Sequence, residues 1–392
     1  METADMSSLV DIAFQLHWKS KDAEHVELYA ARNVNLWRDW LPREVHQSIL
    51  GKRVWERLHV DYKPGGLCGS STPPLKIDRD HFNMSPQSGR FYPKGRLRGI
   101  PGVFPQNMQP FRCLAVNNSG MEVDMDHPLA RYPLRLSMTI GKMTAKENER
   151  GGSSIDWVGL LTEGPGMQAR RDGNPTDFFS EDPFVRRDEA EDSGFYDTPR
   201  LVHHLDETAR DMVGDLHKRF VKDGMRVLDL MSSWSSHLPR EVRPAHVCGL
   251  GMNKTELEHN PSLTEIRIHD LNNFPVLPYA SEDFDVVICT ASIEYLTHPV
   301  RVFSDVARVL KPGGVFVVSF SNRWFPTKAI HIWEQLHEFE RMGLVLEYFL
   351  RSGVFDNFGT YTMRGLPRPA NDKYAGELIF SDPVFAVWGY RK

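Results

Sequence analysis

The sequence predicts two domains of different class, a mostly antiparallel β domain followed by an α/β domain with a parallel sheet. The chain has 392 residues, which is too long for one ordinary hydrophobic core. Over residues 7–143, short apolar runs alternate with turns that contain Gly, Pro and Asn, a pattern typical of antiparallel strands. From residue 196 onward strands alternate with helices, which is typical of a parallel sheet covered on both faces.

Three apolar runs mark the strands expected in the N-terminal half. They cover Leu9–Phe14, Arg53–Val60 and Leu134–Ile140, and turn-forming residues separate them. Residues 144–195 are polar and rich in Gly, Asp, Glu and Arg, so we interpret them as a linker or surface loop. Within that stretch, Ile155–Leu161 is expected to form either one strand or a short docking segment.

The C-terminal half carries helix and strand signals in alternation. A helix is expected from Pro199, which suits a first helical turn, to Phe220, with Gly224 ending it. A second helix, 299–310, is stopped by the sequence Lys-Pro-Gly-Gly at 311–314. The other expected elements are a helix at 328–341 and strands at 226–230, 247–250, 266–268, 284–289, 315–320, 344–350 and 383–390. Because ligands of such sheets bind at the carboxyl ends of the strands, the site is expected there.

Composition and charge exclude several classes of protein. The net charge is -5, with 47 basic and 52 acidic residues, which gives no electrostatic reason to expect nucleic acid as a partner. The first thirty residues contain no apolar run long enough for a signal peptide or a membrane span. The four cysteines have no metal-site spacing. We therefore expect a cytoplasmic protein with free thiols, no bound metal and no membrane partner.

A group of motifs carries a family resemblance for the C-terminal half. They are Leu277–Tyr279, Asp283–Val287, Glu294–Leu296 and Val306–Gly314, in that order and spacing. This stretch closely resembles the second half of the class I S-adenosyl-L-methionine (SAM)-dependent methyltransferase domain, of the methyltransferase type 11 kind. The resemblance implies a Rossmann-like fold, a transferase activity and SAM as the cofactor.

The same resemblance implies which residues hold the cofactor. In this family the turn after the first strand holds the amino-acid part of SAM, the second strand ends near the ribose, and the third ends near the adenine. Here the first turn has Ser and Met in place of glycines, and Gly251 stands where an acid is expected; Asn253 or Glu256 could substitute, whereas Asp270 fits the adenine-binding acid. The implied residues are Asp229, Met231, Ser232, Ser233, Gly249, Gly251, Asn253, Asp270, Leu271, Thr290 and Ala291.

Candidates for the chemistry lie near the same ends of the strands. Methyl transfer requires alignment and, for a weak nucleophile, a base. The candidate catalytic residues are Glu294, Tyr295, Arg323 and His237, with Tyr196 and His204 nearby in the expected fold. Glu294 could instead be a helix-start carboxylate, and His237 an ordinary loop histidine. The segment Ser321–Thr327 is either an acceptor wall or a helix cap formed by Thr327 with a packed Trp324.

The N-terminal half has a resemblance of its own. Met125–Ala130 reads Met-Asp-His-Pro-Leu-Ala, and an expected strand follows it. This segment resembles the one that closes SlyD-like FKBP-type prolyl isomerases, and 41–60 and 77–82 resemble their helix, strand and the start of their inserted subdomain. At Gly66–Gly69 the tyrosine of the isomerase pocket is missing. The implied domains are an FKBP-like domain, 1–145, with a subdomain inserted at about 73–125, a linker or docking segment, 146–195, and a methyltransferase-like domain, 196–392.

Three functions follow from these expectations. The first is a SAM-dependent methyltransferase with an unidentified acceptor, a polypeptide among the candidates, and an FKBP-like domain that recruits the substrate. The second is a peptidyl-prolyl isomerase or holdase chaperone joined to a degenerate methyltransferase-like binding module. The third is a scaffold without catalysis.

Overall fold

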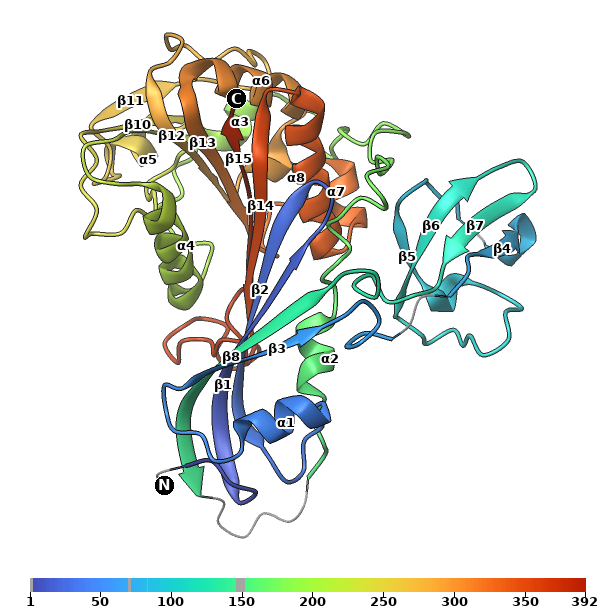
Figure 1. The fold of residues 1–392 in the computed structure, drawn as a ribbon. Helices are drawn as coiled ribbons and strands as arrows, with labels where there is room; N and C mark the ends of the chain where they lie inside the picture. Colours follow the sequence, from blue (N-terminus) through green and yellow to red (C-terminus); the bar gives the residue numbers. More distant parts are fainter. Residues whose placement is uncertain (1–2, 70–71, 83, 146–151) are drawn as a thin grey trace. The chain divides into compact units, whose positions relative to one another are not determined.

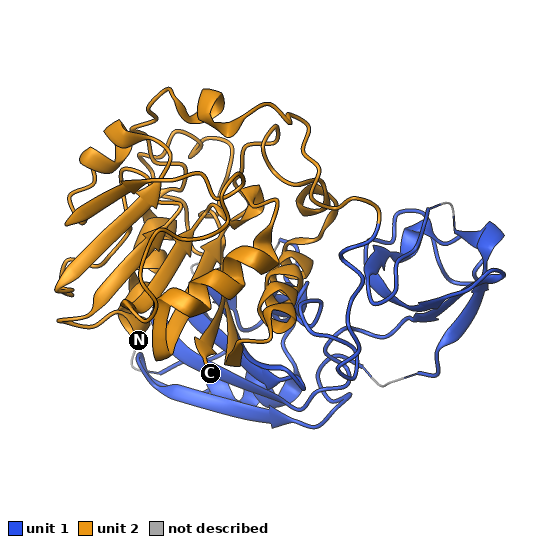
Figure 2. Cartoon of the chain, turned by 90° about the horizontal axis from the view of Figure 1, so that it is seen from above, with its two compact units in different colours: residues 1–180 blue, residues 181–392 orange. Residues whose placement is uncertain are grey.

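The structure is a computed structural model that describes residues 3–69, 72–82, 84–145 and 152–392. It divides into two compact units, Met1–Ser180 and Glu181–Lys392 (Figure 2). The expected linker, 146–195, is shared between them: residues 152–180 belong to the first unit and 181–195 to the second, while 146–151 lie outside the described residues.

The first unit contains an antiparallel sheet with the strand order β2-β1-β8-β3 (Figure 1). Its strands are β1 (Ser8–Lys19), β2 (Ala23–Asn35), β3 (Arg57–Tyr62) and β8 (Leu134–Ala145). Along β1 buried side chains alternate with more exposed ones, so one face of the strand enters the core. The three expected strands correspond to β1, β3 and β8; β2 was not predicted.

Two short helices complete the core of this sheet: α1 (Arg43–Ile49) and α2 (Trp157–Thr162). The strand considered for 155–161 is therefore wrong, because this segment forms α2. Its helix start is stabilised by the Asp156 carboxylate, which accepts a hydrogen bond from the Gly159 amide. Trp157 and Leu161 of α2 are buried.

Residues 75–124 form a second, separate antiparallel sheet between β3 and β8 in the chain. Its strands are β4 (Leu75–Asp78), β5 (Phe91–Pro93), β6 (Pro110–Val116) and β7 (Gly120–Asp124), in the order β4-β7-β6-β5. The 3₁₀ turns η1 (Arg79–His81) and η2 (Lys94–Arg96) connect its parts. The rings of Phe82, Tyr92 and Phe111 pack against one another, so this sheet has its own core.

The second unit is built on a sheet with the strand order β11-β10-β9-β12-β13-β15-β14 (Figure 1). Its bounds are β9 (Arg226–Leu230), β10 (His246–Gly251), β11 (Glu265–Ile268), β12 (Phe284–Thr290), β13 (Leu310–Phe320), β14 (Phe355–Arg364) and β15 (Val384–Arg391). The first five of these in spatial order are parallel, and β15 and β14 extend the sheet in antiparallel fashion. The parallel, Rossmann-like sheet predicted from the sequence is confirmed.

Helices cover both faces of this sheet. They are α3 (Asp192–Tyr196), α4 (Glu207–Phe220), α5 (Lys254–Glu258), α6 (Pro299–Val309), α7 (His331–Gln335) and α8 (Glu338–Ser352), with the 3₁₀ turn η3 (Ile293–Tyr295). On one face, Phe220 of α4 packs 5.2 Å from the Trp388 ring. On the other, Phe316 of β13 lies 4.9 Å from Phe303 of α6 and 5.5 Å from Phe349 of α8, measured between ring centroids.

Three expected elements are wrong in detail. The helix expected from Pro199 begins only at Glu207, where the Asp206 carboxylate accepts a hydrogen bond from the Ala209 amide. The helix expected at 328–341 is divided into α7 and the start of α8, because Leu336 has an extended backbone. The strand expected near 344–350 is part of α8. The eleven consecutive residues 339–349 of α8 are buried, so this part of the helix lacks the exposed polar face that reveals a surface helix.

None of the helices within the described part of the chain is both long and apolar enough to cross a membrane.

Candidate active site

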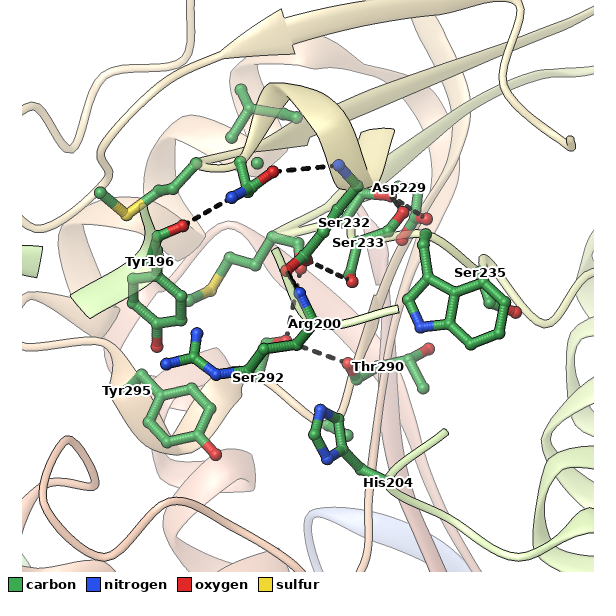
Figure 3. A pocket seen from close by; sticks show the side chains of 18 of the residues that line it. Tyr196, Arg200, His204, Asp229, Ser232, Ser233, Ser235, Thr290, Ser292 and Tyr295 are labelled. Carbon is green, nitrogen blue, oxygen red and sulfur yellow. Dashed lines mark hydrogen bonds between the residues drawn. The ribbon is translucent and has the colours of Figure 1, made fainter. Parts of the chain in front are cut away.

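A cleft opens at the carboxyl ends of β9, β10, β11 and β12 of the second unit (Figure 3). It lies where the loops after four neighbouring parallel strands meet, as expected for this class of sheet. The side chains that define the cleft come from these loops, from α3 and from the segment before α4. They are Asp192, Tyr196, Arg200, Val202, His203, His204, Leu205, Asp229, Met231–Ser235, His237, Leu250–Asn253, Glu256, His269–Asn272, Thr290–Ser292, Tyr295, Leu296 and Phe325.

The first turn, residues 231–237, follows β9. Met231 has φ +57°, so the left-handed conformation that usually requires glycine is taken by Met231 and not by the serines after it. The Ser232 hydroxyl donates a hydrogen bond of 2.6 Å to the Asp229 carboxylate, and the Ser232 amide donates one of 2.7 Å to the Leu250 carbonyl. Burial raises the pKa of Asp229 to about 6. The serines thus replace glycines by bonding the turn to β9 and β10.

The end of β10 lies directly beneath the first turn. A Cβ atom on Gly251 would come within 2.2 Å of the Ser232 carbonyl oxygen, so no side chain, acidic or other, fits at residue 251 without moving the turn. The Asn253 side chain accepts a hydrogen bond from the Glu256 amide and donates to the carbonyls of Tyr196 and Asp197. Asn253 therefore caps α5 and anchors the end of α3.

Among the carboxylates that line the cleft, that of Glu256 follows most closely in sequence after Gly251, the last residue of β10. Its two oxygens accept hydrogen bonds from the Ser233 hydroxyl, at 2.6 Å, and from the Arg200 amide, at 2.7 Å. Glu256 therefore links three parts of the cleft: the first turn, α5 and the segment before α4.

Asp270 follows β11. Its carboxylate accepts hydrogen bonds from the amides of Asn272 and Asn273 and from the Asn273 side chain, at 2.8 to 3.2 Å. Since a carboxylate offers about four acceptor positions, one remains for a ligand. Asp270 is therefore fixed by its own loop and still able to accept a bond from the cleft.

After β12 the chain turns sharply at Ala291, whose φ is +50°. The Ala291 amide donates to the Ser319 carbonyl at 2.8 Å, and the Ser292 hydroxyl donates to the Thr290 carbonyl at 3.0 Å. This turn places Thr290, Ala291 and Ser292 in the lining of the cleft, where the Ser292 hydroxyl lies 3.4 Å from the Met231 carbonyl oxygen of the first turn. Ser292 was not among the residues expected from the sequence.

Aromatic side chains form another wall of the cleft, from residues of α3, η3 and the loop after β13. Phe325 is central: its ring centroid lies 6.0 Å from that of Tyr295 and 5.1 Å from that of His204. The Phe325 amide donates to the Tyr295 hydroxyl at 2.9 Å. Part of the segment 321–327 thus faces the cleft, as considered from the sequence, whereas Thr327 caps no helix, because α7 begins at His331 after Ile330.

Of the four candidate catalytic residues, Tyr295 and His237 line the cleft, whereas Glu294 and Arg323 do not. The Glu294 side chain is buried in the core, where desolvation raises its pKa to about 7, and its Oε2 atom has no hydrogen-bond partner among the residues that the structure describes. Arg323 instead donates to Asp382 at 3.0 Å and lies over the Tyr374 ring. Burial lowers the pKa of His237 to about 3, which makes it a weak base.

Among the expected cofactor residues, only Gly249 lies outside the lining of the cleft. A Cβ atom on Gly249 would come within 2.4 Å of a methyl carbon of Leu263, so this glycine leaves room for the loop before β11. The other ten, from Asp229 to Ala291, surround the cleft.

A buried ion-pair network holds α3 beside the cleft. The ammonium group of Lys328, a side chain with no exposed surface, lies 3.1 Å from the Asp188 carboxylate and 3.2 Å from that of Asp192. Arg186 also binds Asp192, at 2.7 Å. Asn272 donates to Asp192 at 2.8 Å, which joins α3 to the loop after β11. No local sequence pattern predicts this network, because Asn272 and Lys328 lie far in the chain from the segment that contains Arg186, Asp188 and Asp192.

Elsewhere in the second unit, His246, Cys248 and Glu265 bring their side-chain donor atoms within 4.8 Å of one another. These groups are bonded within the protein: His246 to Glu265 at 3.1 Å, and Cys248 to the Tyr279 hydroxyl at 3.0 Å.

Comparison with known proteins connects this unit to methyltransferases. A family profile described as a methyltransferase domain matches residues 234–318. The phthiotriol/phenolphthiotriol dimycocerosates methyltransferase 1 of Mycobacterium ulcerans is 31% identical over 141 residues, which are 33% of this chain and 49% of that protein. The ubiquinone/menaquinone biosynthesis C-methyltransferase UbiE of Laribacter hongkongensis is 26% identical over 137 residues, 32% of this chain and 54% of that protein. The chain thus spans about half the length of these two relatives.

Solved structures give a similar comparison. A SAM-dependent methyltransferase of Thermotoga maritima, a possible histamine N-methyltransferase, matches 49% of this chain and 92% of its own with a TM-score of 0.35 and 16% identity. A SAM-dependent methyltransferase of Mesorhizobium loti matches 45% of this chain and 96% of its own, with a TM-score of 0.31 and 19% identity. The profile match and the sequence relatives, and not these structural similarities, indicate a methyltransferase domain within the second unit, for which S-adenosylmethionine is the cofactor.

Proposed function

We propose that this chain transfers the methyl group of SAM to an acceptor that enters the cleft beside Tyr196, Tyr295 and Phe325. The observation that supports the proposal is the meeting of four loops at one cleft: the first turn, the end of β10, the Asp270 loop and the turn at Thr290–Ser292. These are the segments that the family resemblance assigns to the cofactor.

The residues present fit the cofactor with two changes from the family pattern, one in the first turn and one at residue 251. Asp270 has an acceptor position left for the adenine amine, and the first turn is bonded into a fixed shape by Asp229 and Ser232. The ribose would lie over Gly251, where the space of an acidic side chain is taken by the Ser232 carbonyl. Glu256 is then the nearest carboxylate for the ribose hydroxyls, and it would have to share its oxygens with Ser233 and Arg200.

The protein's part in the reaction is alignment. When bound, the cofactor supplies an electrophilic methyl group, which forms a bond to the acceptor's lone pair as its bond to sulfur breaks and leaves a neutral thioether. The aromatic wall would hold the acceptor in line with that bond and exclude water. If the acceptor must lose a proton, His204 is the candidate base, because burial and the nearby Lys373 lower its pKa and keep the ring neutral at pH 7.

Binding of the product tests this proposal without knowledge of the acceptor. Isothermal titration of the full chain with S-adenosylhomocysteine should give a saturable heat at one site per chain. Absence of binding by both SAM and S-adenosylhomocysteine would contradict the proposal.

A second proposal concerns the first unit, which we infer recruits polypeptide, in keeping with its resemblance to FKBP-type isomerases. The supporting observation is a set of large apolar side chains exposed on the small sheet and its loops: Leu75, Met84, Phe104, Met108 and Val116. Exposed apolar side chains of this kind suit contact with unfolded chains.

The first unit is tested in two assays on the full chain. We expect suppression of aggregation of a denatured client protein, weakened when Phe104 and Met108 are both changed to Ser. Acceleration of a peptide prolyl isomerisation would favour the isomerase alternative. Background behaviour in both assays would remove the recruitment proposal and leave the methyltransferase proposal untouched.

A further inference from the structure

Arg200 brings a positive charge into the cleft, and no carboxylate side chain in the described part of the protein is paired with it. One of its terminal nitrogens, Nη2, donates 2.9 Å to the Phe195 carbonyl oxygen. The backbone amide of Arg200, and not its guanidinium group, donates a hydrogen bond to Glu256, whose other carboxylate oxygen accepts one from Ser233. A guanidinium group stays charged at any physiological pH.

Aromatic rings fix the position of this guanidinium group. Its central carbon lies 4.4 Å from the centroid of the Phe195 ring and 5.3 Å from that of the Phe325 ring, and the two rings are 5.5 Å apart. Stacking of this kind is stabilising and leaves the edge of the guanidinium plane, with its N–H donors, available for a planar anion. Arg200 is labelled in Figure 3 between Tyr196 and Ser292.

The acid of α3 that lines the cleft is already paired with cations. Asp192 lines the cleft, but it is bound by Arg186, Lys328 and Asn272. It therefore has two cations of its own and does not need Arg200. Tyr196 and Tyr295 also line the cleft, and each carries a hydroxyl group that can donate a hydrogen bond. A guanidinium group can donate two parallel N–H hydrogen bonds to the two oxygens of a carboxylate, and the two hydroxyl groups can donate further bonds to the same anion.

Arg200 is also on the acceptor side of the cleft. Its stacking partners, Phe195 and Phe325, belong to α3 and to the loop after β13, whereas the expected cofactor residues come from the loops after β9 to β12. We propose that Arg200, with Tyr196 and Tyr295, forms an anion-binding subsite for the acceptor, which is a planar compound or group that carries a carboxylate. This inference rests on the proposed function.

A carboxylate could come from two sources, the acceptor or the aminobutyrate tail of the cofactor, and the test separates them. The full chain is first saturated with S-adenosylhomocysteine, and benzoate and benzamide are then titrated as probes. They have the same ring and nearly the same shape, and differ in charge. We expect benzoate to bind at least about tenfold more tightly than benzamide, the effect of one charge-assisted hydrogen bond.

Variants of Arg200 then test whether this residue causes the preference for benzoate over benzamide. Arg200→Gln should abolish it and Arg200→Lys should keep part of it, because Lys retains the charge and loses the planar fork. Arg219→Gln is the matched control: the Arg219 guanidinium group also stacks on aromatic rings, those of Trp388 and Tyr361, but it does not line the cleft. This control should bind both probes as the unchanged protein does.

Three results would overturn the assignment. One is equal affinity for benzoate and benzamide in the unchanged protein. Another is a preference for benzoate that survives in Arg200→Gln. The third is a loss of affinity for S-adenosylhomocysteine in Arg200→Gln with unchanged affinity for 5′-methylthioadenosine, which lacks the carboxylate, since this would assign Arg200 to the cofactor. Failure of the unchanged protein to bind S-adenosylhomocysteine would contradict the proposed function instead, and it is seen before any probe is added.

Discussion

Gly251 and Ser232 are in backbone contact: a Cβ atom on Gly251 would lie 2.2 Å from the Ser232 carbonyl oxygen. This contact explains two departures from the family pattern at once. The first turn lies so close to β10 that an acid cannot stand at residue 251, and the Ser232 amide closes the contact by its bond to Leu250. The first turn can keep this position only if residue 251 has no side chain, so the missing glycines of the turn and the missing acid at the end of β10 have one structural cause.

Gly251→Ala should displace the first turn, because the added methyl group meets backbone atoms that cannot rotate away. We expect a loss of stability of about 1–3 kcal/mol, the usual cost of overpacking, and at least tenfold weaker binding of S-adenosylhomocysteine. Urea unfolding and titration calorimetry measure the two effects. Gly376→Ala, at a glycine with no atom near its Cβ position, is the control. Unchanged binding in Gly251→Ala would show that the turn does not hold the cofactor.

Asp270 should select adenine over hypoxanthine through its remaining acceptor position. We expect S-inosylhomocysteine, which has a carbonyl in place of the adenine amine, to bind about tenfold more weakly than S-adenosylhomocysteine, as expected for a bond to a charged group. The difference should disappear in Asp270→Ala. A variant that still discriminates between the two ligands would place the adenine elsewhere.

Glu294→Gln should change the pH dependence of stability and leave cofactor binding intact. Burial raises the pKa of Glu294 from 4.5 to about 7, so the folded state holds this proton more tightly than the unfolded state does. The contribution of this proton to the free energy of unfolding is complete below about pH 4.5 and is lost as the pH rises towards 7. At 1.36 kcal/mol per pKa unit it amounts to about 3 kcal/mol.

Urea unfolding at pH 4.5 and pH 8 measures the effect. The unchanged protein should lose stability over this range relative to Glu294→Gln, while both bind S-adenosylhomocysteine equally at pH 8, because Glu294 does not line the cleft. Equal pH profiles in the two proteins, or lost binding in Glu294→Gln, would contradict the position of Glu294 in the core and outside the cleft.

Lys328→Met should destabilise the second unit and loosen α3. The change leaves Asp192 buried with one cation fewer, and breaking a buried pair typically costs about 3–5 kcal/mol. Hydrogen exchange should rise in 184–196. Lys254→Met, which removes an exposed ion pair with Glu258, is the control and should change stability by less than about 0.5 kcal/mol. Protection of 184–196 that is the same in both variants would contradict this role of Lys328.

The parallel strands and the loops after them could be predicted because buried strands are short apolar runs with turn residues after them. That order alone brought Asp229, Gly251, Asp270 and Thr290 to one cleft. In contrast, α8 is buried on all sides, and a helix without a polar face cannot be distinguished by periodicity from a strand.

The remainder of the site depends on contacts between distant parts of the chain. The position of Arg200 is set by Phe195 and Phe325, and that of α3 by Lys328. No local pattern reveals such contacts. Glu294 follows the expected strand, but its side chain turns into the core, and sequence position alone could not show this direction.

A crystal structure of the full chain grown with S-adenosylhomocysteine tests the central claim most directly. We predict density in the cleft, with the adenine amine at Asp270, the ribose over Gly251 and the sulfur facing Thr290–Ser292. An empty cleft at saturating ligand, or density for the ligand at another place in the chain, would contradict the claim that these loops form a SAM-dependent methyltransferase site.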